Sequence, residues 1–373
     1  MKVLHLAIIY ICFFCKPAAK AFGKKNRVPS IPHPDQTFTM PAEEHPHEGT
    51  WLQWPHDYED PSRNLVRRYE ESWIQMTLAL HEGERVHIIV YNAFQHGRVK
   101  TLLTQRGCDM SAIDFYEFPT NDVWTRDNGP IFVFDNQDKN LTISNWEFNG
   151  WGNKFPYKES NEVPKLIAEE LGLPIVDVPM VHEGGSVEVD GRGTLMAKRS
   201  SILNRNRNKG WKQKDAEAYF SHYLGVNNFI WLDGQKGLDI TDDHIDGTAR
   251  FARKNTIVTF YRKDFLNRKE YDILEKAVNA DGEKYNLVHL PITTRRVAGR
   301  EYGYYVNYYV GNKVVLMPSF DDPSDDVAAA TLQELYPNRK VVMIPMVEVL
   351  KDGGMVHCVT QQQPIRTYTP IES

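Results

Sequence analysis

Amphipathic helix patterns recur along this chain, and each is followed within a few residues by a short apolar strand. The helices are predicted at about 62–81, 163–172, 213–224, 266–279 and 325–336. The strands that follow them are predicted at 86–90, 174–176, 229–231, 287–290 and 341–344. The last four strands start roughly 55 residues apart, a spacing typical of internally repeated structure. No linker rich in Pro, Gly or Ser divides the chain, so we expect one α/β domain of repeated modules.

The polar motifs of the chain lie in the loops after these units. Asp127 follows the first unit, Glu183 the second, His244 and Asp246 the third, and Cys358 the fifth. Further strand-like runs at 256–260 and 314–317 lie between units. Loops at strand ends carry function because their side chains and backbone are free of the ladder. If the units circle an axis, these loops converge on one point and form one candidate site.

Composition narrows the class of protein. The 373 residues are 41% hydrophobic and 25% charged, as in an ordinary soluble globular protein. The net charge is −5 and no basic block occurs, so nucleic-acid binding has no electrostatic support. Aromatic residues make up 12% of the chain, and they can pack the core or line a pocket for a cationic ligand.

Residues 1–21 have the pattern of a signal peptide. Lys2 is followed by an apolar run from Val3 to Cys15, and Ala19-Lys20-Ala21 resembles a small-x-small cleavage site. The run is too short to span a bilayer comfortably, and no later segment reaches 18 apolar residues. We therefore predict an exported protein without stable membrane insertion, with residues 22–373 as the mature chain and an uncleaved anchor as the alternative. Asn140-Leu141-Thr142 is a glycosylation sequon, which has meaning only in a eukaryotic secretory pathway.

Cys358 lies in a glycine-flanked turn close to the end of the chain, within the segment Gly353 to Gln361. Apart from it, the chain after residue 21 contains only Cys108 as a further cysteine. A cysteine in such a turn is a candidate nucleophile if a histidine and carboxylates can be brought to it. Two alternatives are a buried structural cysteine and, in an oxidising compartment, a Cys108–Cys358 disulfide.

His244 is the candidate acid–base residue, because a histidine can give or take a proton near neutral pH. In an extended stretch, His244 and Asp246 point to the same face. Four aspartates lie between Asp239 and Asp246, so a calcium loop is one alternative, although the spacing is not that of an EF-hand. Zinc held by His244, Asp246 and Cys358 is another, although ligand pairs at close spacing are absent from the sequence.

Glu183 precedes a Gly-Gly turn, and Trp124 stands three residues before Asp127. Taken singly, Glu183 reads as a solvated turn residue and Asp127 as half of a surface ion pair with Arg126. A planar cation as the substrate would explain why three carboxylates, a histidine and a thiol occur in one site. A guanidinium stays protonated at physiological pH and pairs with carboxylates bidentately. A thiolate beside it would be stabilised by its charge.

These motifs resemble the agmatine deiminase and bacterial-type peptidylarginine deiminase family, within the guanidino-group-modifying superfamily. The resemblance covers roughly residues 38 to 366. The matching segments are Met40–Glu43, His47–Trp51, Trp124–Pro130, Phe148–Gly152, Glu183–Ser186, Leu203–Asn208, Asp242–Asp246, Tyr305–Asn307 and Gly353–Pro364. The resemblance implies a five-bladed pseudosymmetric α/β propeller of the pentein type, in a single domain with the site on its axis.

The resemblance also implies a role for each site residue. Cys358 would attack the guanidinium carbon, and His244 would protonate the departing ammonia and then activate water. Asp127 and Asp246 would grip the guanidinium nitrogens, and Glu183 would orient His244. Trp124 would pack against the guanidinium, with Asn307 as a further substrate contact. No metal and no cofactor is implied.

The sequence points to agmatine as the substrate, giving N-carbamoylputrescine and ammonia. The segment Phe148 to Trp151 resembles the agmatine branch and lacks the arginines expected to bind a substrate carboxylate. Ile240, however, stands where the agmatine branch carries an acidic residue, and we expect Asp239 or Asp242 to compensate. The alternatives are a peptidylarginine or another guanidine giving citrulline, amidino transfer to an amine, and a secreted binding protein with a Cys108–Cys358 disulfide. A papain-like protease fits poorly because its cysteine lies near the mature N-terminus. The oligomeric state, a homo-oligomer included, stays open.

Overall fold

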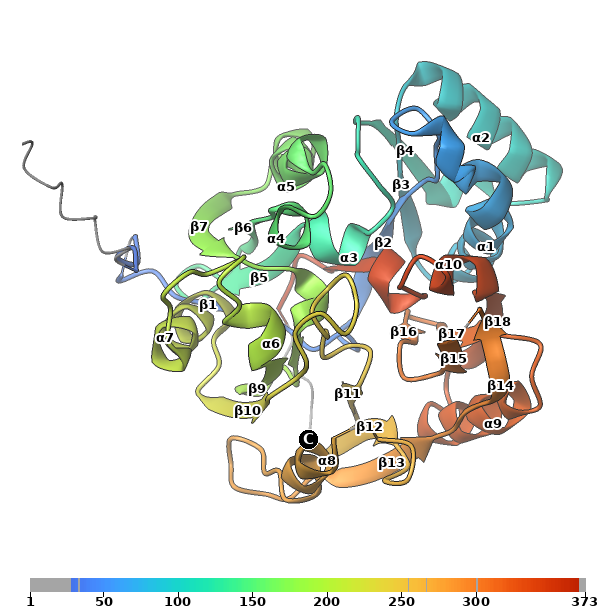
Figure 1. Ribbon diagram of the computed structural model, residues 1–373. Helices are drawn as coiled ribbons and strands as arrows, with labels where there is room; N and C mark the ends of the chain where they lie inside the picture. Colours follow the sequence, from blue (N-terminus) through green and yellow to red (C-terminus); the bar gives the residue numbers. More distant parts are fainter. Residues whose placement is uncertain (1–27, 33, 254, 266, 300, 369–373) are drawn as a thin grey trace, which may run out of the picture.

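The computed structural model of the protein describes residues 28–368 apart from 33, 254, 266 and 300. The predicted signal peptide at residues 1–21 lies outside this range. Helices and strands alternate along the chain, as predicted, and the strands form several small sheets instead of one large one (Figure 1). Within the described residues no sheet closes on itself. None of the helices in this range is both long enough and apolar enough to cross a bilayer.

Five sheets share one strand pattern: the first strand is antiparallel to the middle strand, and the middle strand is parallel to the third. The first of them is β5 (Ile131–Asp135), β6 (Leu141–Glu147) and β7 (Ile175–Val181). The others are β8 (Val187–Val189), β9 (Thr194–Lys198) and β10 (Asn228–Leu232); β11 (Ala249–Ala252), β12 (Thr256–Phe260) and β13 (Asn286–Leu290); β16 (Tyr309–Val310), β17 (Val314–Ser319) and β18 (Lys340–Pro345); and β19 (Gln361–Pro364), β2 (His47–Gln53) and β3 (Arg85–Val90).

Each parallel pair is joined by a helix. Two parallel strands need a crossover connection, which returns the chain to the end of the sheet where the first of the two strands began. The crossover helices are α1 (Leu65–Leu80), α5 (Lys158–Leu171), α7 (Gln213–Leu224), α8 (Arg268–Glu275) and α9 (Ser324–Leu335). They are the five helices that the amphipathic pattern predicts, and the five strands predicted after them are β3, β7, β10, β13 and β18. The strand-like runs at 256–260 and 314–317 are β12 and β17. The repeated helix–strand pattern is therefore confirmed.

The remaining elements extend this pattern. β1 (Phe38–Thr39) pairs with β5, β4 (Ile113–Glu117) pairs with β3, and β14 (Ile292–Ala298) with β15 (Glu301–Tyr304) forms a separate hairpin. The sequence did not predict α2 (Ala93–Gln105), in which Gln95, Val99 and Leu103 are the only buried residues, so its apolar stripe is weak. The short helices are α3 (Thr125–Asn128), α4 (Gly150–Asn153), α6 (Arg199–Ile202), α10 (Val347–Leu350), η1 (Pro61–Arg63), η2 (Met110–Ala112), η3 (Gly184–Ser186) and η4 (His357–Val359).

The site is positioned by three single turns, in which α3 contacts both η3 and η4. Gly184 permits one of these contacts, because a Cβ at this position would lie 2.1 Å from the backbone oxygen of Arg126 in α3. Gly354, shortly before η4, permits another, because a Cβ there would lie 2.2 Å from Cζ3 of Trp124. Both glycines belong to the Gly-Gly pairs of the sequence motifs, and any larger residue would push these turns apart.

Candidate active site

Every predicted site residue lies in the short segment just before the first strand of a sheet. Asp127 in α3 precedes β5, Glu183 precedes β8, and His244 and Asp246 precede β11. Asn307 precedes β16, and Cys358 in η4 precedes β19. The five sheets thus each contribute one segment, and contacts between these segments bring the six side chains together, as the sequence predicts.

Cys358 is half-buried, and its thiol is free. Nδ2 of Asn307 lies 3.4 Å from the sulfur, and Oδ2 of Asp246 lies 3.8 Å from it. Burial raises the pKa of the Cys358 thiol well above its usual value, and the negative charges of Asp246 and Asp127 raise it further. Without a cation bound in the site, Cys358 is therefore a protonated thiol near neutral pH.

His244 lies between two buried carboxylates. Its Nε2 is 2.9 Å from Oε2 of Glu183, and its Nδ1 is 3.6 Å from Oδ1 of Asp127. Burial lowers the pKa of His244, but the Asp127 charge and the hydrogen bond and charge of Glu183 outweigh it and raise the pKa to about 9. His244 is therefore cationic at neutral pH and can donate a proton from Nδ1 toward the Asp127 side.

Glu183 is fixed by Arg207, a residue to which the sequence assigned no role. Nε and Nη2 of Arg207 lie 2.8 and 3.2 Å from the two carboxylate oxygens of Glu183, and both side chains are buried. Burial alone would raise the pKa of Glu183, but His244 and Arg207 lower it to about 2. Losing one partner of such a buried pair costs about 3–5 kcal/mol, so Arg207 keeps Glu183 ionised and in place. The only sequence signal for Arg207 is its place in the matching segment Leu203–Asn208.

Asp127 and Asp246 face each other across Gly185. A Cβ on Gly185 would lie 2.8 Å from Oδ1 of Asp127, 2.9 Å from Oδ2 of Asp246 and 2.8 Å from Nδ1 of His244. Oδ1 of Asp127 accepts a hydrogen bond from the Gly185 backbone at 3.1 Å, and Oδ2 accepts one from Nε1 of Trp151 at 2.8 Å. Burial raises the pKa of Asp127 to about 6. The two carboxylates thus concentrate negative charge beside the thiol.

A cavity of about 350 Å³ opens onto this charge. Its walls include the aromatic residues Trp124, Trp151 and Phe155, and Cys358 and Asp127 also line it. A flat cation that enters the cavity can therefore contact aromatic faces, the Asp127 carboxylate and the thiol together.

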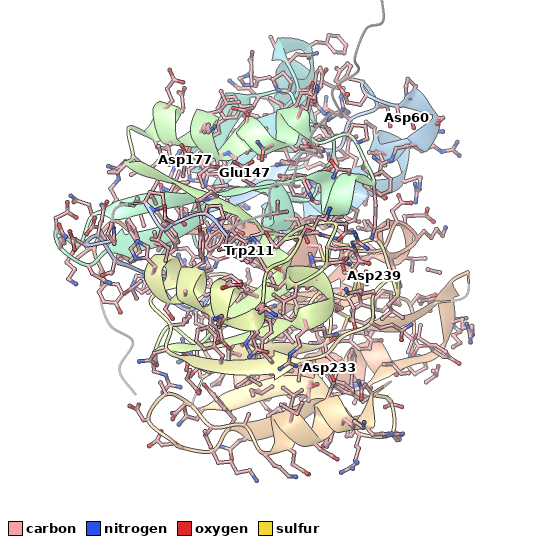
Figure 2. All side chains as sticks on the ribbon, turned by 60° about the vertical axis from the view of Figure 1, so that its left-hand side comes forward. Asp60, Glu147, Asp177, Trp211, Asp233 and Asp239 are labelled. Carbon is pink, nitrogen blue, oxygen red and sulfur yellow. The ribbon has the colours of Figure 1, made fainter. Side chains whose placement is uncertain are left out.

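The aspartate-rich loop before His244 is neutralised by the protein's own cations. Asp242 is paired with Arg207 at 2.5 Å and with Lys154 at 2.8 Å, and Asp243 is paired with Lys198. Asp239 is exposed (Figure 2) and accepts hydrogen bonds from the Thr241 and Asp243 backbone. These partners do not favour a calcium loop.

The zinc alternative meets a similar difficulty, because Nε2 of His244 is taken by Glu183 and Oδ2 of Asp246 lies 2.8 Å from Nδ1 of His357. Within the described residues, no group of three or more His, Cys, Asp or Glu side chains is arranged to hold a metal ion. The disulfide alternative is wrong for this structure, in which Cys108 is a free buried cysteine and Cys358 is also free.

Ile240 lines the cavity, as its position before His244 suggests. The expected compensation by Asp239 or Asp242 is wrong, because Asp239 points to the surface and Asp242 is held by Arg207 and Lys154. The two residues therefore do not reach the substrate side of the loop.

Fold and site together define a class of protein: α/β enzymes in which a cysteine, a histidine and carboxylates from separate modules meet at the end of a cavity. The model of the Porphyromonas-type peptidyl-arginine deiminases matches residues 39–364. The chain thus belongs to the agmatine deiminase and bacterial peptidylarginine deiminase family.

Individual relatives agree with this assignment. The agmatine deiminase of Pseudomonas aeruginosa is 33% identical over 359 residues, covering 88% of this chain and 95% of that protein. The solved structure of the Enterococcus faecalis agmatine deiminase has a TM-score of 0.78 at 26% identity, covering 89% of this chain and 97% of that chain. A cysteine-to-serine variant of the C. jejuni agmatine deiminase, solved with substrate bound, has the same TM-score and identity and covers 89% and 98%.

The electrostatics of the free site predict a poorly reactive thiol. In a Cys108→Ala background, alkylation of Cys358 by iodoacetamide should be slow at pH 7 and keep rising past pH 9, because the buried carboxylates oppose the thiolate. Asp127→Asn removes one of those charges and should increase the rate at pH 8 roughly tenfold. A rate that is already constant between pH 7 and 8 would contradict this account of the site.

Proposed function

We propose that this protein is an agmatine deiminase, which hydrolyses agmatine to N-carbamoylputrescine and ammonia with Cys358 as the nucleophile. The observation that carries the proposal is the pair of buried carboxylates, Asp127 and Asp246, beside a free thiol and a cationic histidine. Two carboxylates suit a guanidinium bidentately. The agmatine deiminases of P. aeruginosa and E. faecalis, and the substrate-bound C. jejuni structure, support this choice of substrate.

In the first half-reaction, the bound guanidinium offsets the carboxylate charges that oppose ionisation of Cys358, so that the thiol releases its proton to solvent. The thiolate attacks the guanidinium carbon, forming the S–C bond and a tetrahedral adduct. His244 gives its Nδ1 proton to one amino group, the C–N bond breaks, and ammonia leaves. The products are a cationic amidino-thioether on Cys358 and a neutral His244.

In the second half-reaction, neutral His244 takes a proton from water, and the hydroxyl adds to the same carbon. The new adduct collapses, the C–S bond breaks, and Cys358 leaves as a thiolate. The ureido product is released after it loses one proton, which the free ammonia takes up as ammonium. Glu183 orients His244 throughout. Trp124 packs against the guanidinium plane, and Asn307, 3.4 Å from the sulfur, contacts the reacting centre.

The five equivalent sheets also support a finer description of the fold. We infer that they are the blades of a five-bladed pseudosymmetric propeller of the pentein type, with residues 22–373 as one catalytic domain. The shared strand order and the position of each site residue before a first strand support it. An experimental structure with the sheets arranged without a common axis would refute it. The export predicted from residues 1–21 belongs to the same proposal, and N-terminal sequencing of the mature protein tests it.

Ammonia release tests the reaction and its nucleophile. The wild type should release ammonia from agmatine, and Cys358→Ser should lose essentially all of this activity because the serine hydroxyl is a much weaker nucleophile. Failure of agmatine, arginine and arginyl peptides alike to release ammonia would refute the deiminase proposal. Activity that survives in Cys358→Ser would refute the nucleophile.

Gly185→Ala tests the site geometry in the same assay. Its methyl group would occupy the space between Asp127, Asp246 and His244, so we expect a loss of at least about 100-fold in kcat/KM. Gly97→Ala in α2 is the matched control, because a Cβ there meets nothing within 4 Å and alanine favours a helix. Equal effects of the two substitutions would contradict the proposed site.

A second candidate substrate has a carboxylate, as in free arginine or a peptide with a C-terminal arginine, and would give citrulline. Two observations favour it: Ile240 offers no charge to an ammonium tail, and Arg63 lines the cavity. No carboxylate of the described chain lies within ion-pair distance of Arg63. Against it, Glu59 and Asp60 line the same cavity and favour a cationic tail, so agmatine remains the proposed substrate. Asp352 also lines the cavity but is paired with Arg68 at 2.9 Å.

Arg63→Gln separates the two candidates. It should leave kcat/KM for agmatine within about twofold and lower kcat/KM for arginine about tenfold, the typical loss of one charged hydrogen bond. Lys351→Gln is the matched control, because Lys351 also lines the cavity but is paired with Glu348. If Arg63→Gln impairs agmatine as strongly as arginine, Arg63 does not select the tail.

A further inference from the structure

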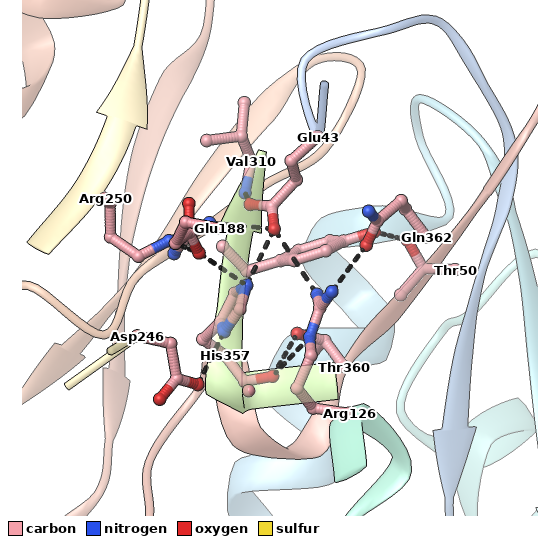
Figure 3. A network of polar contacts seen from close by, with 12 residues as sticks. Glu43, Thr50, Arg126, Glu188, Asp246, Arg250, Val310, His357, Thr360 and Gln362 are labelled. Carbon is pink, nitrogen blue, oxygen red and sulfur yellow. Dashed lines mark hydrogen bonds and ion pairs between the residues drawn. The ribbon is translucent and has the colours of Figure 1, made fainter. Parts of the chain in front are cut away.

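A second cluster of ionisable groups includes His357, the residue before Cys358, and of its members only Asp246 belongs to the proposed guanidinium site (Figure 3). It consists of three acidic and three basic side chains, brought together from different parts of the chain. They are Glu43, Glu188, Asp246, Arg126, Arg250 and His357. The proposed reaction gives no role to the other five.

His357 joins the cluster to the site. Its Nδ1 lies 2.8 Å from Oδ2 of Asp246, and its Nε2 lies 2.8 Å from Oε2 of Glu43 (Figure 3). Nε2 is also 3.9 Å from Oε1 of Glu188. Ionised carboxylates only accept hydrogen bonds, so His357 satisfies both neighbours only when both of its nitrogens carry a proton. The ring is then a cation.

The two arginines of the cluster pair with Glu43 and Glu188. Arg250 lies 2.8 Å from Glu43 and is also paired with Glu188, while Arg126 lies 3.3 Å from Glu43. Burial nevertheless raises the pKa of Glu188, so Glu43 and Asp246 are the carboxylates that need a hydrogen-bond donor from the His357 ring. Burial opposes ionisation of Glu43, yet Arg250 and His357 hold its pKa well below the usual value.

The oxygen that His357 holds is the one that faces the nucleophile. Oδ2 of Asp246 lies 3.8 Å from the Cys358 sulfur and 2.9 Å from the Cβ position of Gly185. The backbone N–H of His357 also donates to Oδ1 of Asn307 at 3.0 Å, and Asn307 contacts the same sulfur. His357 thus reaches the site through two residues without lining the cavity itself.

We propose that His357 is a positioning residue, which keeps the Asp246 carboxylate ionised and aimed at the guanidinium site while Glu43 holds the far side of its ring. The inference rests on the proposed function. In this arrangement the negative charge of Glu43 favours the cationic form of His357. The positive charge of His357 in turn favours the ionised form of Asp246 before substrate binds.

The proposal separates the roles of the two guanidinium-binding carboxylates at low pH. The basic groups around Asp246 are His357, His244 and Arg250. The acidic groups around it are Asp127, Glu188 and Cys358. Burial raises its pKa, but the hydrogen bond and charge of His357 dominate the opposing contributions, and the pKa stays below its usual value. Asp127, with a pKa of about 6, is then the group whose protonation weakens guanidinium binding as the pH falls.

The test measures agmatine binding by calorimetry between pH 5 and 8 in the Cys358→Ser protein, where no turnover occurs. In this background, affinity should fall below about pH 6 with the uptake of one proton. Adding His357→Asn keeps a neutral donor near Asp246 but removes the cation, so the pKa of Asp246 rises. The pH below which agmatine affinity decreases should then rise by about one unit, and the decrease should become steeper. Binding should be about tenfold weaker at pH 6.5 than at pH 8.

Glu43→Gln tests the far side of the His357 ring, because it removes the carboxylate that favours the doubly protonated ring. It should also raise the pH below which agmatine affinity decreases, but by less than His357→Asn does, since the ring nitrogen beside Asp246 remains. No upward shift in His357→Asn, or a His357→Asn loss that is the same at every pH, would overturn the proposal and leave His357 a structural residue.

Absence of agmatine binding to Cys358→Ser at every pH would count against the proposed function instead. Nitrogen NMR of histidine-labelled protein then decides the state of His357 independently, with His357→Asn identifying its signals. Two protonated ring nitrogens at pH 7 support the proposal, and a neutral tautomer overturns it.

Discussion

The structure depends on the compensation of buried charge. Ionised groups removed from water are tolerated only when paired, and nearly every buried carboxylate around the site faces a cation of the protein. Glu183 faces Arg207 and His244, Glu43 and Glu188 face Arg250, and Asp242 faces Arg207 and Lys154. Asp127 is less fully compensated, because it shares the His244 cation with Glu183 and its other polar side-chain partner is an indole N–H. Asp122, which also lines the cavity, accepts hydrogen bonds from the Trp124 backbone and from Asn128.

The incomplete compensation of Asp127 supports the proposed selection of a cation. A guanidinium between Asp127 and Asp246 completes a charge pattern that the protein leaves incomplete, and the same event favours the thiolate of Cys358. In the proposed reaction, substrate binding and activation of Cys358 are thus one electrostatic step. A neutral ligand of the same shape would fill the cavity without changing the state of the thiol.

The sequence predicts the parts of this arrangement that have a local pattern. The five helices and the strands after them follow from hydrophobic periodicity, and Cys358, His244 and Asp127 follow from polar motifs in the loops beyond them. The sequence did not predict α2, because few of its residues are buried and its apolar pattern is therefore weak. The family resemblance supplied the roles that spacing alone could not, such as the pairing of Glu183 with His244.

Other residues could not be predicted because their function lies in long-range partners. Arg207 and Glu183 are separated by 24 residues, and His357 and Glu43 by 314. Glu43 and His357 both lie in matching segments, yet nothing in their local sequence indicates that they meet. The same reason applies to Asp242, which was expected to replace an acid at Ile240 but is held by Arg207 and Lys154, 35 and 88 residues away. Asp239, the other expected replacement, is exposed.

The pairing of β19 with β2 has a consequence for when the protein becomes active. β19 is the last of the described strands, β2 is among the first of them, and Cys358 lies shortly before β19. With Cys358 as the nucleophile, a chain synthesised only up to residue 350 contains the carboxylates of the proposed site but neither the reactive sulfur nor the strand that positions it. On the proposed mechanism, activity therefore requires β19 to pair with β2, so a product truncated before Cys358 is inactive.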